Sequence, residues 1–271
     1  MVNKISKSLI LYTLLNRIPL IIFTGFDENN CLAILRNLAK IVFFRDVLIL
    51  NREVRDNKEL DKLINAEEIE DLSNRYTIIG YTNDYSQLQK FKDFTSFIIA
   101  TNNIKEADLE ILIPQSFLGL YIDTKSTRLF THELNVKEMD LSFEEFVLNK
   151  INSETSKPLD DIVYLLKTQL DLFKVSEESE IWKNTLDISK EREAIRNTIL
   201  QTELQKFISA SEKIYMLLRK ANQFEEIDKK LNIKINANDL VGPIGYNNAS
   251  IARMISFIEA NWRNDYSKYL I

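Results

Sequence analysis

The sequence has few of the residues that hold metals or interrupt regular structure. It contains one cysteine, one histidine, five glycines and four prolines among 271 residues. A single cysteine cannot form an internal disulfide, and with a single histidine it excludes cysteine-rich and histidine-rich metal sites. Scarce glycine and proline favour helices and plain strands over a loop-rich β sandwich. No apolar run is long enough to span a bilayer, so we expect a cytoplasmic protein without a membrane segment.

The charge balance excludes another class of partner. The sequence contains 40 acidic residues and 35 lysines and arginines, which gives a net charge of -5. A mildly acidic chain is not a bulk binder of nucleic acid or of membrane surfaces, although a local basic face remains open. Apolar residues make up 45% of the chain and charged residues 28%, a composition typical of folded proteins.

Short apolar runs alternate with helical patterns through the first half of the chain. The predicted strands cover residues 19–24, 42–50, 76–81, 96–101, 118–123 and 128–133. The predicted helices cover residues 6–16, 31–39, 57–74, 85–94 and 107–113. This alternation predicts an α/β fold, with a mainly parallel sheet covered by helices on both faces.

The pattern changes at the polar run 153–158, the best linker candidate. We therefore predict an α/β domain at 1–152 and an all-helical domain at 153–271. Helical periodicity covers residues 159–173, 187–222, 224–231 and 249–269, and the glycine- and proline-containing stretch 236–248 is expected to be a loop. The buried side of the long helix is predicted to carry Ile195, Ile199, Leu204, Phe207, Ile208, Ile214, Leu217 and Leu218.

The first strand ends in Thr24-Gly25, where many α/β domains bind a phosphate. A phosphate-binding loop of the form G-x-x-x-x-G-K-[ST] is absent, and no lysine follows Gly25. Asp27 and Glu28 would repel a triphosphate, at about 1 kcal/mol or more per close pair of charges. We interpret the two carboxylates as groups that cap the helix and oppose its dipole, and we expect no nucleotide and no other cofactor.

The lone cysteine and the lone histidine both favour structural roles. Cys31 lies on the apolar stripe of its predicted helix, which indicates a buried small side chain rather than an activated thiol. His132 stands in a predicted strand with no serine or cysteine assigned to it by any motif. No metal site is predicted, although a site for Mg²⁺ made only of carboxylates stays open.

Basic residues concentrate in the helical half, near Trp262 and Tyr266. A basic surface edged by aromatic rings is one way to contact nucleic acid. A solvated helix face with interleaved charges is the alternative that we favour. The candidate contacts are Arg192, Arg196, Lys206, Lys213, Arg219, Lys220, Arg253 and Arg263.

The segment Phe-Ile-Ile-Ala-Thr-Asn-Asn at 97–103 resembles the sensor strand of AAA-type P-loop ATPases, which usually ends in Thr-Asn. Residues 107–114, Phe117 and the run 121–123 are similar to the stretch that follows in those proteins. The Walker lysine after Gly25 is absent, and no paired acids end the strand at 76–81. The resemblance covers the first half of the chain. It implies a nucleotide-free member, similar in plan to clamp-loader subunits that keep an ATPase fold without ATP and assemble through a helical C-terminal domain.

A second resemblance is to the restriction-endonuclease-like nucleases. It rests on the run 80–84, a helix with Gln87 and Gln89, the strand 97–100, and Pro114 followed by Gly119-Leu120-Tyr121. The E-x-K motif is replaced by residues 81–83, which implies a copy unable to activate water through Mg²⁺. A nuclease using other carboxylates would draw on Glu53, Asp56 and Asp84.

Together these patterns predict a non-catalytic scaffold or assembly subunit. Its degenerate ATPase-like domain would carry a helical domain that binds a protein partner. The alternatives are a Mg²⁺-dependent nuclease or nuclease-like subunit acting on DNA or RNA, and a nucleic-acid-binding adaptor whose affinity would fall steeply with salt.

Overall fold

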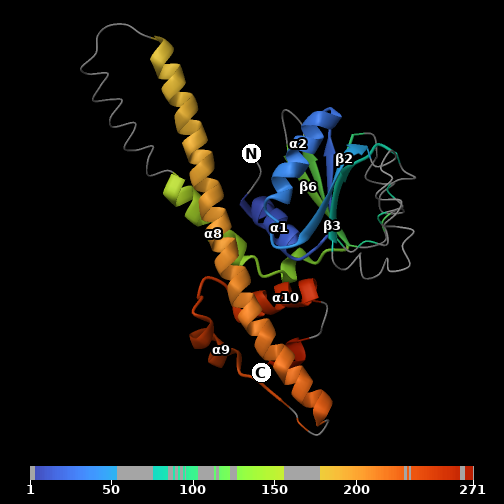
Figure 1. Cartoon of the computed structure of the whole chain (residues 1–271). Coiled ribbons are helices and arrows are strands. Elements are labelled where there is room, and N and C mark those ends of the chain that lie inside the picture. The colour runs from blue at the N-terminus through green and yellow to red at the C-terminus, as the bar shows by residue number, and fades with distance from the viewer. Residues whose placement is uncertain are drawn as a thin grey trace, which may run out of the picture. The chain divides into compact units, whose positions relative to one another are not determined.

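A computed structural model gives the fold (Figure 1). It describes residues 4–53, 76–84, 88, 91, 94, 96–102, 113, 116–122, 127–155, 178–228, 231, 233–262 and 266–270. The elements are α1 (Lys4–Leu15), β1 (Leu20–Thr24), α2 (Glu28–Ala39), β2 (Asp46–Glu53), β3 (Tyr76–Tyr81), β4 (Phe97–Thr101), β5 (Phe117–Ile122), β6 (Thr127–His132), η3 (Val136–Glu138), an unlabelled helix at 142–155, α8 (Glu178–Ile227), α9 (Ala237–Ile244), α10 (Ile251–Trp262) and η4 (Ser267–Tyr269).

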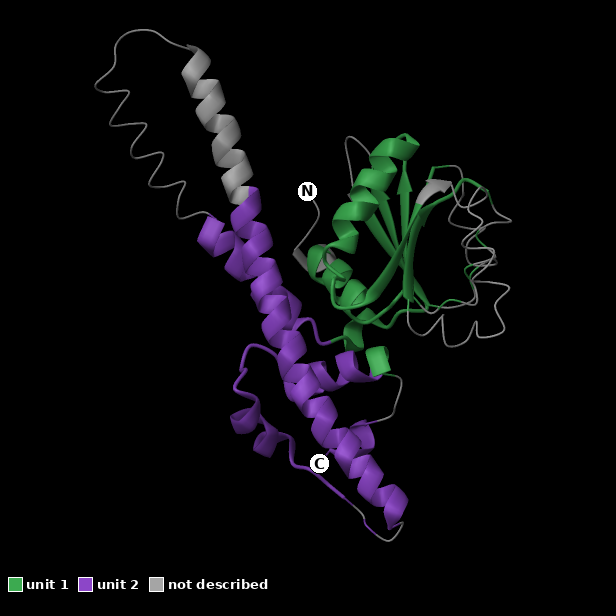
Figure 2. Cartoon of the chain, viewed as in Figure 1, with its two compact units in different colours: residues 1–139, 260–262 green, residues 140–259, 263–271 purple. Residues whose placement is uncertain are grey.

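The chain divides into two compact units (Figure 2). Unit 1 comprises residues 1–139 and 260–262, and unit 2 comprises residues 140–259 and 263–271. The polar run at 153–158 predicts a domain boundary near residue 152. In the structure, the two units divide between Met139 and Asp140. The reason is that the helix at 142–155 packs inside unit 2, where the Phe143 ring stacks on Phe207 at 4.1 Å between centroids.

Unit 1 is built on a six-stranded sheet with the order β2-β3-β4-β1-β5-β6. Every neighbouring pair is parallel except β5 with β6, which form an antiparallel hairpin at one edge. The predicted mixed α/β class with a mostly parallel sheet is therefore confirmed. Strand β1 lies in the interior of the sheet, between β4 and β5.

Alternate residues of the strands pack into two separate cores, because successive side chains of a strand point to opposite faces of the sheet. One core joins Leu20 and Ile22 of β1 to apolar residues of α1 and α2, including Leu9, Cys31 and Leu35. On the other face, Ile21 and Phe23 pack with Phe91, Phe94, Phe97 and other apolar residues. Both faces of the parallel strands are thus buried, which explains their almost continuous apolar sequences.

One predicted strand of unit 1 begins later than expected. Strand β2 begins at Asp46 rather than at residue 42, because residues 40–44 form turns in which the Val42 amide donates to the Ala39 carbonyl. Val42 itself is fully buried beside α2, so its apolar character reflects the end of the helix rather than a strand. The expected helix at 57–74, and most of those at 85–94 and 107–113, lie outside the described residues.

Unit 2 is helical. Helix α8 extends beyond the predicted 187–222 at both ends and includes the first part of the separate helix expected at 224–231. Its inner face supplies Leu204, Phe207, Ile214 and Leu218, all fully buried. The helix expected at 159–173 lies outside the described residues.

The stretch 236–248, expected to be a loop, contains a helix. Asn236 caps α9 by accepting from the Asn238 amide, and Gly245 ends it in the left-handed region at φ 68°. Leu240 and Ile244, one turn apart, are buried and hold the helix despite Pro243 in its last turn. Helix α10 ends at Trp262 rather than near residue 269, and η4 follows it. Within the described part of the chain, no helix is both long and apolar enough to cross a membrane.

Candidate functional site

The strand order points to one place in unit 1 where a ligand would be expected. After β1 the chain passes through α2 to β2 at one edge, whereas after β4 it crosses to β5 on the far side of β1. The connections therefore leave the neighbouring strands β1 and β4 in opposite directions. Open α/β sheets bind ligands at the carboxyl ends of such strands, so the candidate site lies at Thr24 and Thr101.

The turn after β1 uses its own side chains to satisfy its backbone. The Thr24 hydroxyl accepts from the Phe26 amide at 3.1 Å, and Asp27 Oδ1 accepts from the Asn30 amide at 2.9 Å. Asp27 is the N-cap of α2 and Glu28 stands in the first turn, so the predicted capping role of Asp27 is confirmed. A phosphate at this helix end would have to displace one carboxylate and lie beside another.

The neighbouring strand ends are joined to each other in the same way. Asn83 Oδ1 accepts from the Asn102 amide at 3.0 Å, which ties the end of β3 to the end of β4. The Thr82 hydroxyl accepts from the Asp84 amide at 3.2 Å. The fully buried Thr101 hydroxyl has no hydrogen-bond partner and lies in register with Phe23. As far as its residues are described, the site is therefore a set of short polar turns without a converging group of catalytic side chains.

The structure describes only part of the three acids that a nuclease would use. Glu53 ends β2 in register with Tyr81, and Asp84 follows β3, so two of the acids belong to neighbouring strand ends. The side chain of Glu53 and the whole of Asp56 lie outside the description. Among the described residues, no three His, Cys, Asp or Glu side chains are grouped to hold a metal ion.

Cys31 and His132 both make packing contacts. Cys31 is fully buried, and its thiol lies 3.6 Å from the Phe26 carbonyl. Burial raises the pKa of this thiol, and the negative charge of Asp27 raises the pKa further. The ring of His132 stacks on Phe117 at 5.0 Å between centroids. The interpretation of Cys31 as a buried apolar residue is confirmed.

We expect the native protein to resist thiol reagents. Because the Cys31 thiol is buried and kept protonated, modification requires local opening of α2. A disulfide reagent should react about a hundredfold or more slowly with native protein than with protein unfolded in urea, where one thiol per chain becomes titratable. Rapid labelling of one thiol per chain in the native protein would contradict this assignment.

One residue of the proposed basic surface is not on the surface. Arg253 is fully buried in unit 2, where its Nε donates to Glu144 Oε1 at 3.0 Å and its Nη2 donates to the same oxygen. Its guanidinium also lies over the Phe207 ring, 5.3 Å from the centroid. Arg253 is therefore wrong as a nucleic-acid contact. Its partner stands 109 positions earlier, so local sequence gives no sign of the pair.

The other candidate basic residues that the structure describes are exposed, and one of them is paired with an acid. Arg196, Lys206, Lys213, Arg219 and Lys220 are exposed on α8. Lys206 and Lys150 each place Nζ 3.0 Å from Glu203 Oε1. Burial by itself raises the pKa of the Glu203 carboxyl, but the hydrogen bonds and charges of the two lysines outweigh it and lower that pKa. The side chain of Arg192 and the whole of Arg263 lie outside the described residues.

Two residues that helical periodicity predicts on the buried side of the long helix are exposed, and further apolar residues of this helix are exposed as well. Ile195 and Leu217 were expected on the buried side, but both are exposed. Three further apolar side chains of α8, Met216, Phe224 and Ile227, are exposed as well. Apolar residues thus occur on two faces of α8, and periodicity alone does not tell which face the rest of the unit covers.

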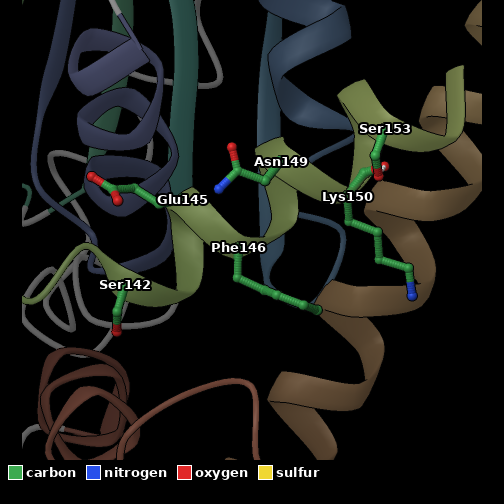
Figure 3. Close-up of a pocket in the computed structure, with 6 residues that line it drawn as sticks. All are labelled: Ser142, Glu145, Phe146, Asn149, Lys150 and Ser153. Atoms are coloured by element: carbon green, nitrogen blue, oxygen red, sulfur yellow. Dashed lines mark hydrogen bonds between the residues drawn. The ribbon is translucent and has the colours of Figure 1, made fainter. Parts of the chain in front are cut away.

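A hollow of about 570 Å³ lies along one side of the helix at 142–155 (Figure 3). The described residues that line it all belong to that helix: Ser142, Glu145, Phe146, Asn149, Lys150 and Ser153. The picture shows Glu145 and Asn149 pointing to one side and Lys150 to the other. Since Lys150 is already paired with Glu203, the hollow does not bring an acid, a base and a nucleophile together.

Comparison with known proteins found no family model that matches the chain, and no curated protein or solved structure significantly similar to it.

Proposed function

We propose that the protein is a non-catalytic assembly subunit. In this proposal, unit 1 is a degenerate ATPase-like domain that holds no nucleotide, and the helical unit 2 binds a protein partner. The carrying observation is the turn after β1, where the carboxylate of Asp27 takes the place at the helix end that a phosphate would need.

Two further features support this proposal. The segments that carry the resemblance to the ATPases, the opening strand β1 and the Thr-Asn strand β4, are hydrogen-bonded neighbours. The turn after β1 also contains Asp27 and Glu28 where a lysine would be needed to bind a phosphate.

The proposal predicts that purified protein does not bind ATP, ADP or GTP at micromolar concentrations with or without Mg²⁺. The negative charges at the α2 terminus oppose the phosphates, and no lysine of the turn compensates them. Isothermal titration calorimetry with each nucleotide checks this result. Saturable binding, or ATP hydrolysis that Asp27→Ala alters, would overturn the nucleotide-free assignment.

The assembly role has its own measurement. In extracts of the host cell, the tagged full chain should elute from a sizing column well ahead of the same purified 31.7 kDa chain. Elution at the same volume in both samples would contradict a role in a stable complex, whatever the nucleotide experiment shows.

A further inference from the structure

The C-terminal half of α8 has an apolar face that the folded unit leaves uncovered. Met216, Leu217, Phe224 and Ile227 are 54%, 41%, 56% and 81% exposed. At about 100° per residue these four side chains fall within one arc of the helix surface. We call them, together with Lys213 and Lys220 on the same arc, the outer face of α8.

The opposite side of the same helix already has its partners. Phe207, Ile214 and Leu218 are fully buried there. Near the end of the helix, the Tyr269 hydroxyl lies 2.9 Å from both Asn222 Oδ1 and Glu225 Oε2. The inner side therefore holds α8 in unit 2, and the apolar side chains of the outer face are not needed for that packing.

The spacing on the outer face matches the seam of a helix pair. Leu217, Lys220, Phe224 and Ile227 follow one another at intervals of three, four and three residues, the spacing of core positions in a coiled coil. One of these positions is a lysine, and charged residues at core positions select partners and register. The face thus has the periodicity needed to bind a second helix.

The charges of the outer face distinguish between partners. Lys213 and Lys220 are exposed on it, and Lys213 Nζ donates to the Ile244 carbonyl at 3.3 Å. In a parallel pair of two copies each lysine would meet its own counterpart, and an antiparallel pair centred on the face would bring the two Lys220 side chains together. Both arrangements oppose like charges. Met216, Leu217 and Ile227 are aliphatic, whereas single-stranded nucleic acid needs aromatic rings for stacking.

We propose that the outer face of α8 binds an acidic amphipathic helix of a partner protein. Apolar side chains of the partner pack between Leu217, Phe224 and Ile227, and its flanking carboxylates pair with Lys213 and Lys220. This inference rests on the proposed role as an assembly subunit and names the chemistry of the partner.

A designed peptide tests the surface directly. The probe is a labelled three-heptad peptide with leucine at both core positions and glutamate at the flanking positions. Fluorescence anisotropy with the full chain should show saturable binding in the micromolar range, weakened by added salt. A matched peptide with lysine in place of every glutamate should not bind.

Variants locate the binding to the face. Phe224→Glu should weaken peptide binding about tenfold or more, because it places a carboxylate in the centre of the apolar contact. Lys220→Glu should weaken binding of the acidic peptide and strengthen binding of the basic one. Val241→Glu, at another exposed apolar residue of unit 2, should change neither affinity. Unchanged circular dichroism spectra establish that each variant is folded.

Three results would overturn the proposal. Peptide binding that is absent, or that Phe224→Glu does not alter, excludes the face as a helix site. A wild-type dimer that Phe224→Glu dissociates makes a second copy the occupant. Binding of a single-stranded RNA that outcompetes the peptide and depends on Lys220 but not on Phe224 makes nucleic acid the ligand.

The host-cell measurement separates this inference from the assembly role. If Phe224→Glu still elutes in the large species, the outer face is not the contact, while the assembly role stands. If the wild-type chain elutes as the free protein, the assembly role itself fails.

Discussion

Replacing Arg253 by methionine should lower the free energy of unfolding of unit 2 by about 3–5 kcal/mol, the range for removing one partner of a buried ion pair. Arg253 and Glu144 are both fully buried, and the arginine donates twice to one carboxylate oxygen. The second oxygen of Glu144 has no hydrogen-bond partner, so the variant leaves a buried carboxylate without its compensating charge. Hydrogen exchange of α10 amides during urea unfolding measures the loss.

The deficit of Arg253→Met should depend on pH. Burial raises the pKa of Glu144 above its ordinary value of 4.5, more than the charge of Arg253 lowers it. A raised pKa in the folded state means that the stability linked to this carboxyl is fully present below its unfolded pKa and is lost as pH rises through the folded pKa. Removing Arg253 raises the pKa further, so the deficit should be smaller near pH 4.5 than at neutral pH.

The double variant Glu144→Leu with Arg253→Met is the matched control. Replacing both members of a buried ion pair by apolar side chains is often neutral or stabilising, by up to about 4 kcal/mol. The double variant should therefore recover most of what Arg253→Met loses. If it is as unstable as the single variant, the packing of Arg253 over Phe207 matters more than its charge.

Replacing Gly119 by alanine should destabilise unit 1 by about 3 kcal/mol, the upper part of the range for overpacked cores. Gly119 lies opposite Phe130 in the β5–β6 hairpin, and a Cβ at this glycine would overlap three carbons of the Phe130 ring. That ring cannot easily move away, because it packs against the rings of Phe23, Phe117 and Tyr121 with centroids 5.6, 5.9 and 5.7 Å away. Thermal unfolding measures the effect.

Gly25→Ala provides the matched control for this experiment. A Cβ at Gly25 meets nothing within 4 Å, so this variant should stay within about 0.5 kcal/mol of wild type. Adding Phe130→Leu to Gly119→Ala should recover part of the loss by replacing the ring with a smaller, more flexible side chain. A fully stable Gly119→Ala variant would show that the aromatic cluster rearranges at little cost.

The cap of α2 and the burial of Cys31 show how far local reasoning extends. Asp27 before a helical pattern predicts an N-cap, and both the donor and the acceptor lie within four residues of each other. Cys31, Leu32 and Leu35 predict the buried side of α2 by their spacing alone. The alternation of strands and helices likewise predicted the α/β class, because each element shows its own period in a short window.

The sequence by itself determined the class of the fold, most of its strands and the anionic turn that follows the first of them. Only the tertiary structure decided the neighbours of β1, the burial of Arg253 beside Glu144, and which apolar face of α8 is covered. The physical reason is distance along the chain. A cap or a period depends on residues within a few positions, whereas Glu144 and Arg253 stand 109 residues apart, and a face is buried only when another element folds onto it.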